Sequence, residues 1–186
     1  MEMEQTKHYH RGLFTGAFDP IHSDHIKALK LSSSMCDELI VAVSTDEVIK
    51  DYKHHDPAIP FEERIAIVDE LKCVTKAIPQ NDLHDKLQMC LDNGIDVLFS
   101  CDEYLRSSYP DPDKMTLKQK AGVERWEKFE QQLNEYGIDV IYNPRGQSTS
   151  STDIKESVAQ SIGYQQPQGV MLYSEGECMC EDVFSL

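Results

Sequence analysis

Short runs of apolar residues alternate with amphipathic segments along this chain, and this alternation constrains its fold more than any other feature. Segments of strand length that are rich in apolar residues lie at residues 13–16, 39–43, 74–78, 95–99 and 138–142, and residues 39–43 form a continuous apolar run. Segments with a helical spacing of apolar residues separate them, as at Ile26 and Leu29 after the first run. Continuous apolar runs are typical of parallel strands buried on both faces. The order therefore predicts an α/β fold, a parallel sheet with helices on both faces.

The chain is expected to form one domain flanked by polar ends. Its 186 residues are enough for a single domain with a sizeable core. Residues 1–10 are polar and predict a flexible N-terminus, while residues 163–186 combine Gln, Gly and acidic residues with scattered apolar ones and predict a C-terminal tail. The domain then comprises residues 11–162. Within it, the polar residues 45–59 predict a loop.

Acidic residues outnumber basic ones, and this balance argues against a protein that binds nucleic acid. The chain has 33 Asp and Glu against 18 Lys and Arg, a formal net charge of −15. Nucleic-acid binding needs a clustered basic surface, which this composition does not readily supply. An anionic ligand must therefore meet local positive charge, for which the candidates are Lys27, Lys50, Lys53, His54, His55, Arg64, Arg145 and Lys155.

The six cysteines are spread along the chain without the spacing of a disulfide framework. Those that adjoin apolar segments are expected in the core: Cys36, Cys73, Cys90 and Cys101. One CxC pair, Cys178 and Cys180, is a weak signal for a metal or redox site. Because no signal region or apolar run of membrane length is present, we expect a cytoplasmic protein without membrane insertion.

The residues that carry chemistry follow the first apolar run directly, in the sequence GAFDPIHSDH at residues 16–25. Gly16 allows a sharp turn and the close approach of a ligand, and Pro20 stiffens the path into the next helix. His22 and His25 are three residues apart near the start of that helix, so they share one face. The free N–H groups and the positive end of the helix dipole favour an anion at the same place. The segment therefore predicts a phosphate-binding site.

Residues 16–25 resemble the GxFDxxHxGH signature of the nucleotidyltransferase superfamily. A second motif occurs in the order that the family has: Arg145 followed by residues 150–155, SSTDIK, is similar to the family's RTxGISTT segment. The cytidylyltransferase branch, especially the bacterial glycerol-3-phosphate cytidylyltransferases, matches best at residues 41–47, at Lys53 and at residues 61–64. The resemblance covers about residues 11–160.

The resemblance implies a Rossmann-like nucleotidyltransferase fold and an enzyme that makes a phospholipid or teichoic acid precursor. CMP would pass from CTP to a phosphorylated alcohol such as glycerol 3-phosphate, with release of pyrophosphate. Mg²⁺ would enter as the complex with CTP, and its protein ligands are left unassigned. The catalytic residues carried over by position are His22, His25, Lys53 and Arg145. The nucleotide-binding residues are Gly16, Ala17, Phe18, His22, His25, Asp102, Arg145, Ser150, Ser151 and Thr152.

For two further residues of these segments, the sequence leaves more than one role open. Asp19 is expected to orient the turn or a metal-bound water. Arg64 either pairs with Glu62 or Glu63 or touches the ligand. The resemblance also implies a homodimer, but residues 72–78 lack the Arg and the acidic residues of the corresponding family segment, so the oligomeric state stays open.

Departures from the family pattern leave alternative functions open. Asp24 replaces the family's Gly and adds a carboxylate beside the expected phosphate site, so a catalytically impaired nucleotide-binding relative is one alternative. Residues 150–152 also resemble the SST of nicotinamide-mononucleotide adenylyltransferases, so an adenylyltransferase that uses ATP is a second. A zinc-binding module formed by His22, His25 and the CxC pair is a third. The insert at residues 105–136 either shapes the acceptor pocket or packs as a solvated helix.

Overall fold

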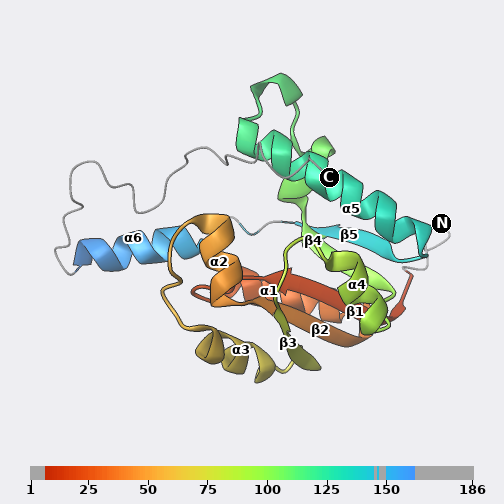
Figure 1. Ribbon diagram of the computed structural model, residues 1–186, viewed down its shortest axis with the longest axis horizontal. Coiled ribbons are helices and arrows are strands. Elements are labelled where there is room, and N and C mark those ends of the chain that lie inside the picture. The colour runs from red at the N-terminus through yellow and green to blue at the C-terminus, as the bar shows by residue number, and fades with distance from the viewer. Residues whose placement is uncertain (1–6, 145, 147–149, 162–186) are drawn as a thin grey trace, which may run out of the picture.

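Five parallel strands form the centre of the protein, in the order β3-β2-β1-β4-β5 (Figure 1). The computed structural model describes residues 7–144, 146 and 150–161. The strands are Tyr9–Gly16 (β1), Cys36–Ser44 (β2), Lys76–Gln80 (β3), Val97–Cys101 (β4) and Asp139–Asn143 (β5). The chain winds from β1 out to β3 and then crosses to the other side for β4 and β5. The strand order therefore reverses next to β1, and in open parallel sheets ligands bind at the carboxyl ends of the strands at such a point.

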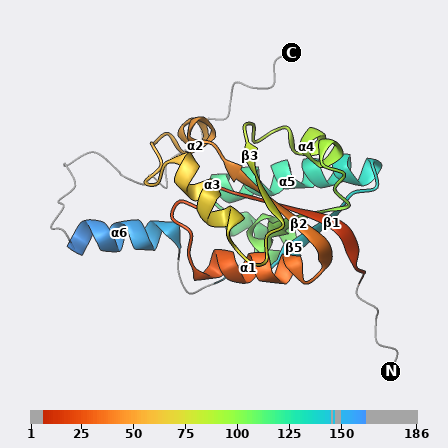
Figure 2. The ribbon, with the colours of Figure 1, turned by 90° about the horizontal axis from the view of Figure 1, so that it is seen from below.

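Helices cover both faces of the sheet, which confirms the predicted fold class. One face carries α1 (Ser23–Ser33) and α3 (Phe61–Asp69), and the other carries α4 (Lys86–Asp92) and α5 (Leu117–Glu135). Figure 2 shows the strands between α1 on one side and α4 and α5 on the other. The remaining elements are α2 (Asp46–Lys53), α6 (Ser151–Ser161) and three 3₁₀ turns, Asp102–Tyr104 (η1), Arg106–Ser108 (η2) and Pro112–Lys114 (η3).

The side chains of the central strands alternate between two apolar clusters. Phe14 and Val41 belong to the cluster beneath α1 and α3, whereas Leu13 and Ala42 belong to the cluster beneath α4 and α5. This alternation follows from the two-residue period of a strand, and both sets are buried because both faces are covered. The core cysteines behave as expected: Cys36 and Cys90 are buried, and Cys73 and Cys101 are half-buried.

Two segments differ from the sequence prediction. The expected loop at residues 45–59 contains α2, which the Thr45 hydroxyl caps by accepting from the Val48 N–H at 3.4 Å. Acidic residues occupy the first turn of α2 and lysines the last, which complements the helix dipole. At the N-terminus, β1 begins at Tyr9, within the segment expected to be flexible, and the Tyr9 hydroxyl donates to Asp139 at 2.8 Å.

The C-terminal helix of the described part, α6, extends away from the sheet layers in both views (Figures 1 and 2). Only the start of α6 approaches the body of the domain, where the Ser151 hydroxyl donates to the carbonyl oxygen of Pro20 at 3.0 Å. Within the described residues, none of the helices combines the length and the apolar character needed to cross a membrane.

Candidate active site

The loop that follows β1 places its residues at the carboxyl edge of the sheet. A Cβ atom on Gly16 would lie only 3.0 Å from the ring of Phe18, so glycine at this position lets the ring fold back against the strand. Phe18 has φ of 53°, a left-handed conformation that is costly for a residue with a side chain. Its ring is 1% exposed and packs against the ring of His25, with centroids 5.0 Å apart. Any contact of Phe18 with a nucleotide would therefore come from its backbone, while its ring supports His25.

The two histidines of the signature form a stacked pair at the start of α1. His22 is the N-cap residue, and its backbone N–H donates to Nδ1 of His25 at 3.3 Å. The ring centroids are 3.8 Å apart with an angle of 33° between the planes. Because Nδ1 of His25 accepts a hydrogen bond, the neutral ring carries its proton on Nε2, which can donate to a ligand.

The electrostatics of the pair keep His25 uncharged. Burial lowers the pKa of His25 to about 3, and the positive charges of His22 and Lys53 act in the same direction. Lys53, the last residue of α2, therefore contributes positive charge at the histidine pair. Three of the four predicted catalytic residues thus interact electrostatically. Their roles stay a prediction, as does that of Arg145, which lies outside the described residues.

Asp19 organises the loop rather than facing a ligand. Its side chain is buried and accepts from the N–H groups of Ala58 at 3.1 Å and Ile59 at 2.9 Å, and it is ion-paired with Lys155 of α6. Burial alone would raise the pKa of Asp19, but the hydrogen bonds from Lys155 and from the two backbone groups outweigh it and lower the pKa. Both carboxylate oxygens are engaged, so Asp19 joins three segments that are distant in sequence. Of its two expected roles, orienting the turn fits these contacts.

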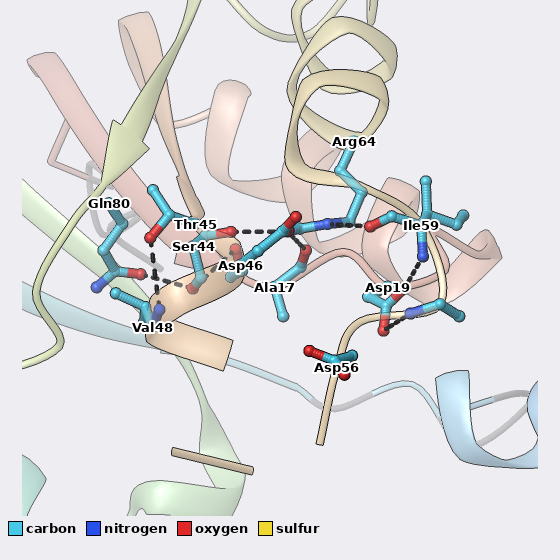
Figure 3. Close-up of polar contacts among 12 residues, drawn as sticks. Ala17, Asp19, Ser44, Thr45, Asp46, Val48, Asp56, Ile59, Arg64 and Gln80 are labelled. Atoms are coloured by element: carbon cyan, nitrogen blue, oxygen red, sulfur yellow. Dashed lines mark hydrogen bonds and ion pairs between the residues drawn. The ribbon is translucent and has the colours of Figure 1, made fainter. Parts of the chain in front are cut away.

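Arg64 is a second organising residue, and its partners differ from those expected (Figure 3). Its side chain is 1% exposed and donates to the carbonyl oxygens of Ala17 at 2.6 Å, Ser44 at 2.7 Å and Ile59 at 2.8 Å. It also pairs with Asp46 at 2.6 Å, not with the neighbouring glutamates. Arg64 therefore fixes the signature loop to the ends of β2 and of the α2–α3 connection. The sequence shows no signal for these contacts, because the partners lie 5 to 47 residues away.

Asp24, the residue that departs from the family pattern, is buried within the site. Its side chain is 6% exposed and pairs with Lys27 of the same helix at 2.8 Å. The carboxyl group also packs on the backbone of Gly146, where an added Cβ would overlap it. Lys27 thus partly neutralises the extra carboxylate. The position of the Asp24 side chain requires glycine at position 146.

The second motif lies at the start of α6. Ser150 caps the helix reciprocally with Asp153: the Asp153 N–H donates to the Ser150 hydroxyl at 3.1 Å, and the Ser150 N–H donates to the Asp153 carboxylate at 2.9 Å. Ser151 contacts Pro20 through its hydroxyl, and Thr152 is exposed. These contacts place the motif beside the signature loop. Ser148 and Thr149 lie outside the described residues.

Asp102 follows β4, the neighbour of β1, and so lies at the same edge of the sheet. Among the residues that the structure describes, no three His, Cys, Asp or Glu side chains are grouped as a set of metal ligands. Both carboxylate oxygens of Asp19 already accept hydrogen bonds from protein donors. The carboxylates at this edge therefore suit a metal ion that arrives with phosphate ligands of its own, because magnesium is commonly held by one or two carboxylates plus substrate phosphates. The CxC pair lies outside the described residues.

Comparisons with known proteins agree with this geometry. The cytidylyltransferase-like family model matches residues 13–157. Glycerol-3-phosphate cytidylyltransferase of Bacillus subtilis (strain 168) is 30% identical over 145 residues, which are 77% of this chain and 93% of that protein. A lipopolysaccharide core biosynthesis protein from Thermoplasma volcanium GSS1 has a similar structure, with a TM-score of 0.54 and 24% identity, over 75% of this chain and 98% of that one.

A protein of unknown function from Archaeoglobus fulgidus is also similar in structure, with a TM-score of 0.53 and 16% identity over 75% of this chain and 93% of that one. Both structural relatives share the fold of this chain.

Proposed function

The chain belongs to the cytidylyltransferase-like family, and from this membership we propose that it transfers CMP from CTP to a small phosphorylated alcohol such as glycerol 3-phosphate, releasing pyrophosphate. The observation that carries the proposal is the stacked pair of His22 and His25 at the end of the central strand. A relative named glycerol-3-phosphate cytidylyltransferase, 30% identical to this chain, supports the choice of CTP and of the acceptor class.

For this reaction the protein has to position the substrates and to supply positive charge. The attacking phosphate is already ionised, so no general base is needed. A phosphate oxygen of the acceptor attacks the α-phosphorus of CTP, and the bond to the bridging oxygen of pyrophosphate breaks on the opposite side. Neutral His25 would donate from Nε2 to an oxygen of the α-phosphate, where negative charge develops. Lys53 and, by resemblance, Arg145 would neutralise the triphosphate.

We propose that Mg²⁺ binds as its complex with CTP. Asp102, at the carboxyl edge of the sheet, would help to hold the ion. Bound to the phosphates, the ion would supply positive charge to the leaving pyrophosphate. Asp19 is not assigned to the metal, because its two oxygens are engaged by Lys155 and by two backbone donors.

Pyrophosphate release with magnesium tests the proposal directly. CTP and ATP are each paired with glycerol 3-phosphate, phosphocholine, phosphoethanolamine and nicotinamide mononucleotide. We expect release with CTP and one phosphorylated alcohol, and a loss of about 10²–10³-fold in kcat for His25→Ala. His8→Ala is the matched control, because His8 is exposed and pairs with Asp37, away from the site. Release with ATP alone would replace this proposal with an adenylyltransferase.

One observation favours a second candidate, a nucleotide-binding relative with impaired turnover. The Asp24 carboxylate is buried where the family has a glycine, and a carboxylate close to phosphates repels them. If this candidate is right, the wild-type protein binds CTP with magnesium but releases no pyrophosphate, and Asp24→Gly gains turnover. Turnover by the wild-type protein excludes it.

A further inference from the structure

The end of β5 and Gly146, which follows it, contact one stripe of α1. The buried side chain of Asn143 donates to the Ser32 hydroxyl at 2.7 Å and to the carbonyl oxygen of Ala28 at 3.5 Å. Nearer the start of α1, the carboxyl group of Asp24 packs on Gly146. Positions 24, 28 and 32 are four residues apart, so they lie on one face of the helix. This face of α1 therefore receives the chain that leads from β5 toward the second motif.

The same order of contacts continues in the loop before α1. There the Ser151 hydroxyl donates to the carbonyl oxygen of Pro20, and Lys155 pairs with Asp19. Figure 2 shows α6 starting beside the N-terminal end of α1. Gly146 lies in the sequence between these contacts and those of β5. The contact of Asp24 with Gly146 therefore holds the chain midway between the sheet and the proposed triphosphate site at the start of α6.

Asp24 and Gly146 depart from the family pattern together. The GxFDxxHxGH signature has Gly where this chain has Asp24, and the RTxGISTT segment has Thr where this chain has Gly146. A Cβ atom on Gly146 would lie 2.1 Å from Cγ of Asp24 and 2.3 Å from its Oδ2. Non-bonded atoms do not approach so closely, so Asp24 in this position and a Thr at position 146 exclude each other. In this chain α1 thus supplies the side chain at the contact, whereas the family motifs place it on the other side.

The first turn of α1 accommodates the buried carboxylate. Asp24 is the second residue of the helix, where the positive end of the helix dipole favours negative charge. It also pairs with Lys27 at 2.8 Å. Local positive charge therefore stabilises Asp24 in the position that meets Gly146.

We propose that Asp24 is a positioning residue for the nucleotide: it holds Gly146 on α1 and so keeps the start of α6 beside the signature loop, where the triphosphate would bind. This inference rests on the proposed function and deepens it, because it gives a residue outside the family pattern a role in binding CTP. Asp24 itself would touch neither substrate. The expectation is opposite to that for an impaired relative, since replacing Asp24 with the family's glycine should weaken CTP binding.

Steady-state kinetics of Asp24→Gly test the positioning role. We expect the KM for CTP to rise about 10-fold, the factor that one weakened charge-assisted hydrogen bond to the triphosphate would give, and the KM for the acceptor to change less than about twofold. Asp92→Gly is the matched control: Asp92 lies in α4, is exposed and accepts from Gln88 of the same helix at 2.6 Å. We expect both of its KM values to be unchanged. An unchanged or lower KM for CTP in Asp24→Gly overturns the proposal.

Two further variants separate the shape of the contact from its charge. Asp24→Gly/Gly146→Thr restores the pair of residues that the family motifs have, so its KM for CTP should return to within about threefold of the wild-type value. Asp24→Asn keeps the shape that packs on Gly146 and removes the charge, and its KM for CTP should not rise. A double variant no better than Asp24→Gly, or an Asp24→Asn variant as weak as Asp24→Gly, would show that the fit to Gly146 does not position the nucleotide.

Direct binding separates the failure of this inference from the failure of the proposed function. If the wild-type protein has no turnover with any pair, titration calorimetry with CTP and magnesium still tests the contact. A Kd that rises in Asp24→Gly, returns in the double variant and is unchanged in Asp92→Gly supports the positioning role in a protein that binds the nucleotide without transferring it. Equal binding by these proteins, no binding of CTP by the wild-type protein, or turnover gained by Asp24→Gly overturns it.

Discussion

The rings of His22 and His25 have centroids 3.8 Å apart, so they cannot both be positively charged without strong repulsion. In this protein His25 bears the repulsion, because burial and the charges of His22 and Lys53 all lower its pKa. A neutral imidazole that donates from Nε2 suits an α-phosphate, because its N–H can stabilise the negative charge that develops there. The arrangement of the pair therefore fixes the donor before the nucleotide binds.

We expect the ring of His25 to show no titration in the folded protein between pH 5 and 8. Its folded pKa of about 3 lies below its ordinary value of 6.5, so the unfolded chain takes up the proton first and His25 reduces the stability of the fold as the pH falls from 6.5 toward 3. The measurement is the ring ¹³C and ¹⁵N shifts of His25 against pH, with the urea-unfolded protein as reference. A folded-state midpoint near 6.5 would contradict this account, and bound CTP should raise the midpoint.

Asp24 and Gly146 form a second pair whose effects on stability should be coupled. A methyl group at position 146 would overlap the Asp24 carboxyl group, so Gly146→Ala should lower the free energy of unfolding by about 1–3 kcal/mol. In an Asp24→Gly background the space is open, and the same change should cost less than about 0.5 kcal/mol. Urea denaturation of the four proteins of this cycle measures the coupling. Equal costs in both backgrounds would mean that the contact contributes nothing.

At the scale of elements, α6 is held to the domain by its first turns. The Lys155–Asp19 ion pair and the contact of Ser151 with Pro20 join it to the signature loop, while the rest of the helix extends from the body (Figure 2). The second motif is thus positioned by the same carboxylate that orders the loop after β1. The proposed triphosphate site depends on this contact, because its two halves come from elements at opposite ends of the domain.

Lys155→Met should therefore destabilise the protein by about 3 kcal/mol, because it leaves the buried Asp19 carboxylate without its cation. Since the pKa of Asp19 is lowered in the fold, the stability that the pair contributes is present above its unfolded pKa and is lost as the pH falls through the folded value. The difference between variant and wild type, measured in urea at pH 7 and again below pH 4, should shrink at the lower pH.

Lys114→Met is the control for this change. Lys114 pairs with Asp111 at the surface, and its side chain is 83% exposed, so the expected loss is under about 1 kcal/mol. A loss for Lys155→Met as small as that of the control would show that α6 is not anchored by this pair.

The sequence predicted the elements that carry strong periodicity and missed those that depend on capping. The parallel sheet followed from buried runs such as residues 39–43, because only a strand covered on both faces is apolar at every position. Helix α2 was missed since it is short and polar, although Thr45 before two acidic residues is a recognisable helix start. This omission concerns function, because α2 is the element that brings Lys53 to the histidine pair.

At the scale of the whole molecule, the site residues that the sequence predicts are those in contiguous motifs, such as His22 and His25. The contacts of Arg64 were not predicted, because its partners lie 5 to 47 residues away and no local pattern encodes them. The same holds for Lys86, a buried residue at the start of α4, whose Nζ lies 3.4 Å from the hydroxyl of Thr15, 71 residues away. Arg64 was placed in the right region with the wrong partners. Lys86 gave no signal, since a lysine at the start of a helix is ordinarily solvated.

The buried charge of Lys86 should make the stability of the whole protein depend on pH in the alkaline range. Its folded pKa of about 8 lies below its ordinary value of 10.5, so between these values the unfolded chain holds a proton that the fold does not, and stability rises with pH. Below pH 8 Lys86 is charged in both states, and its burial then lowers the free energy of unfolding by roughly 3 kcal/mol. Lys86→Met removes this cost and should be more stable than wild type at pH 7.

The advantage of Lys86→Met should shrink as the pH rises toward 10.5. Urea denaturation of both proteins at pH 7, 8, 9 and 10 measures it. The raised pKa values of Tyr9 and Tyr142 affect both proteins alike, and Cys90→Ala in both backgrounds removes a thiol whose pKa responds to Lys86. A difference that stays constant over this range would mean that the ammonium group is solvated in the fold.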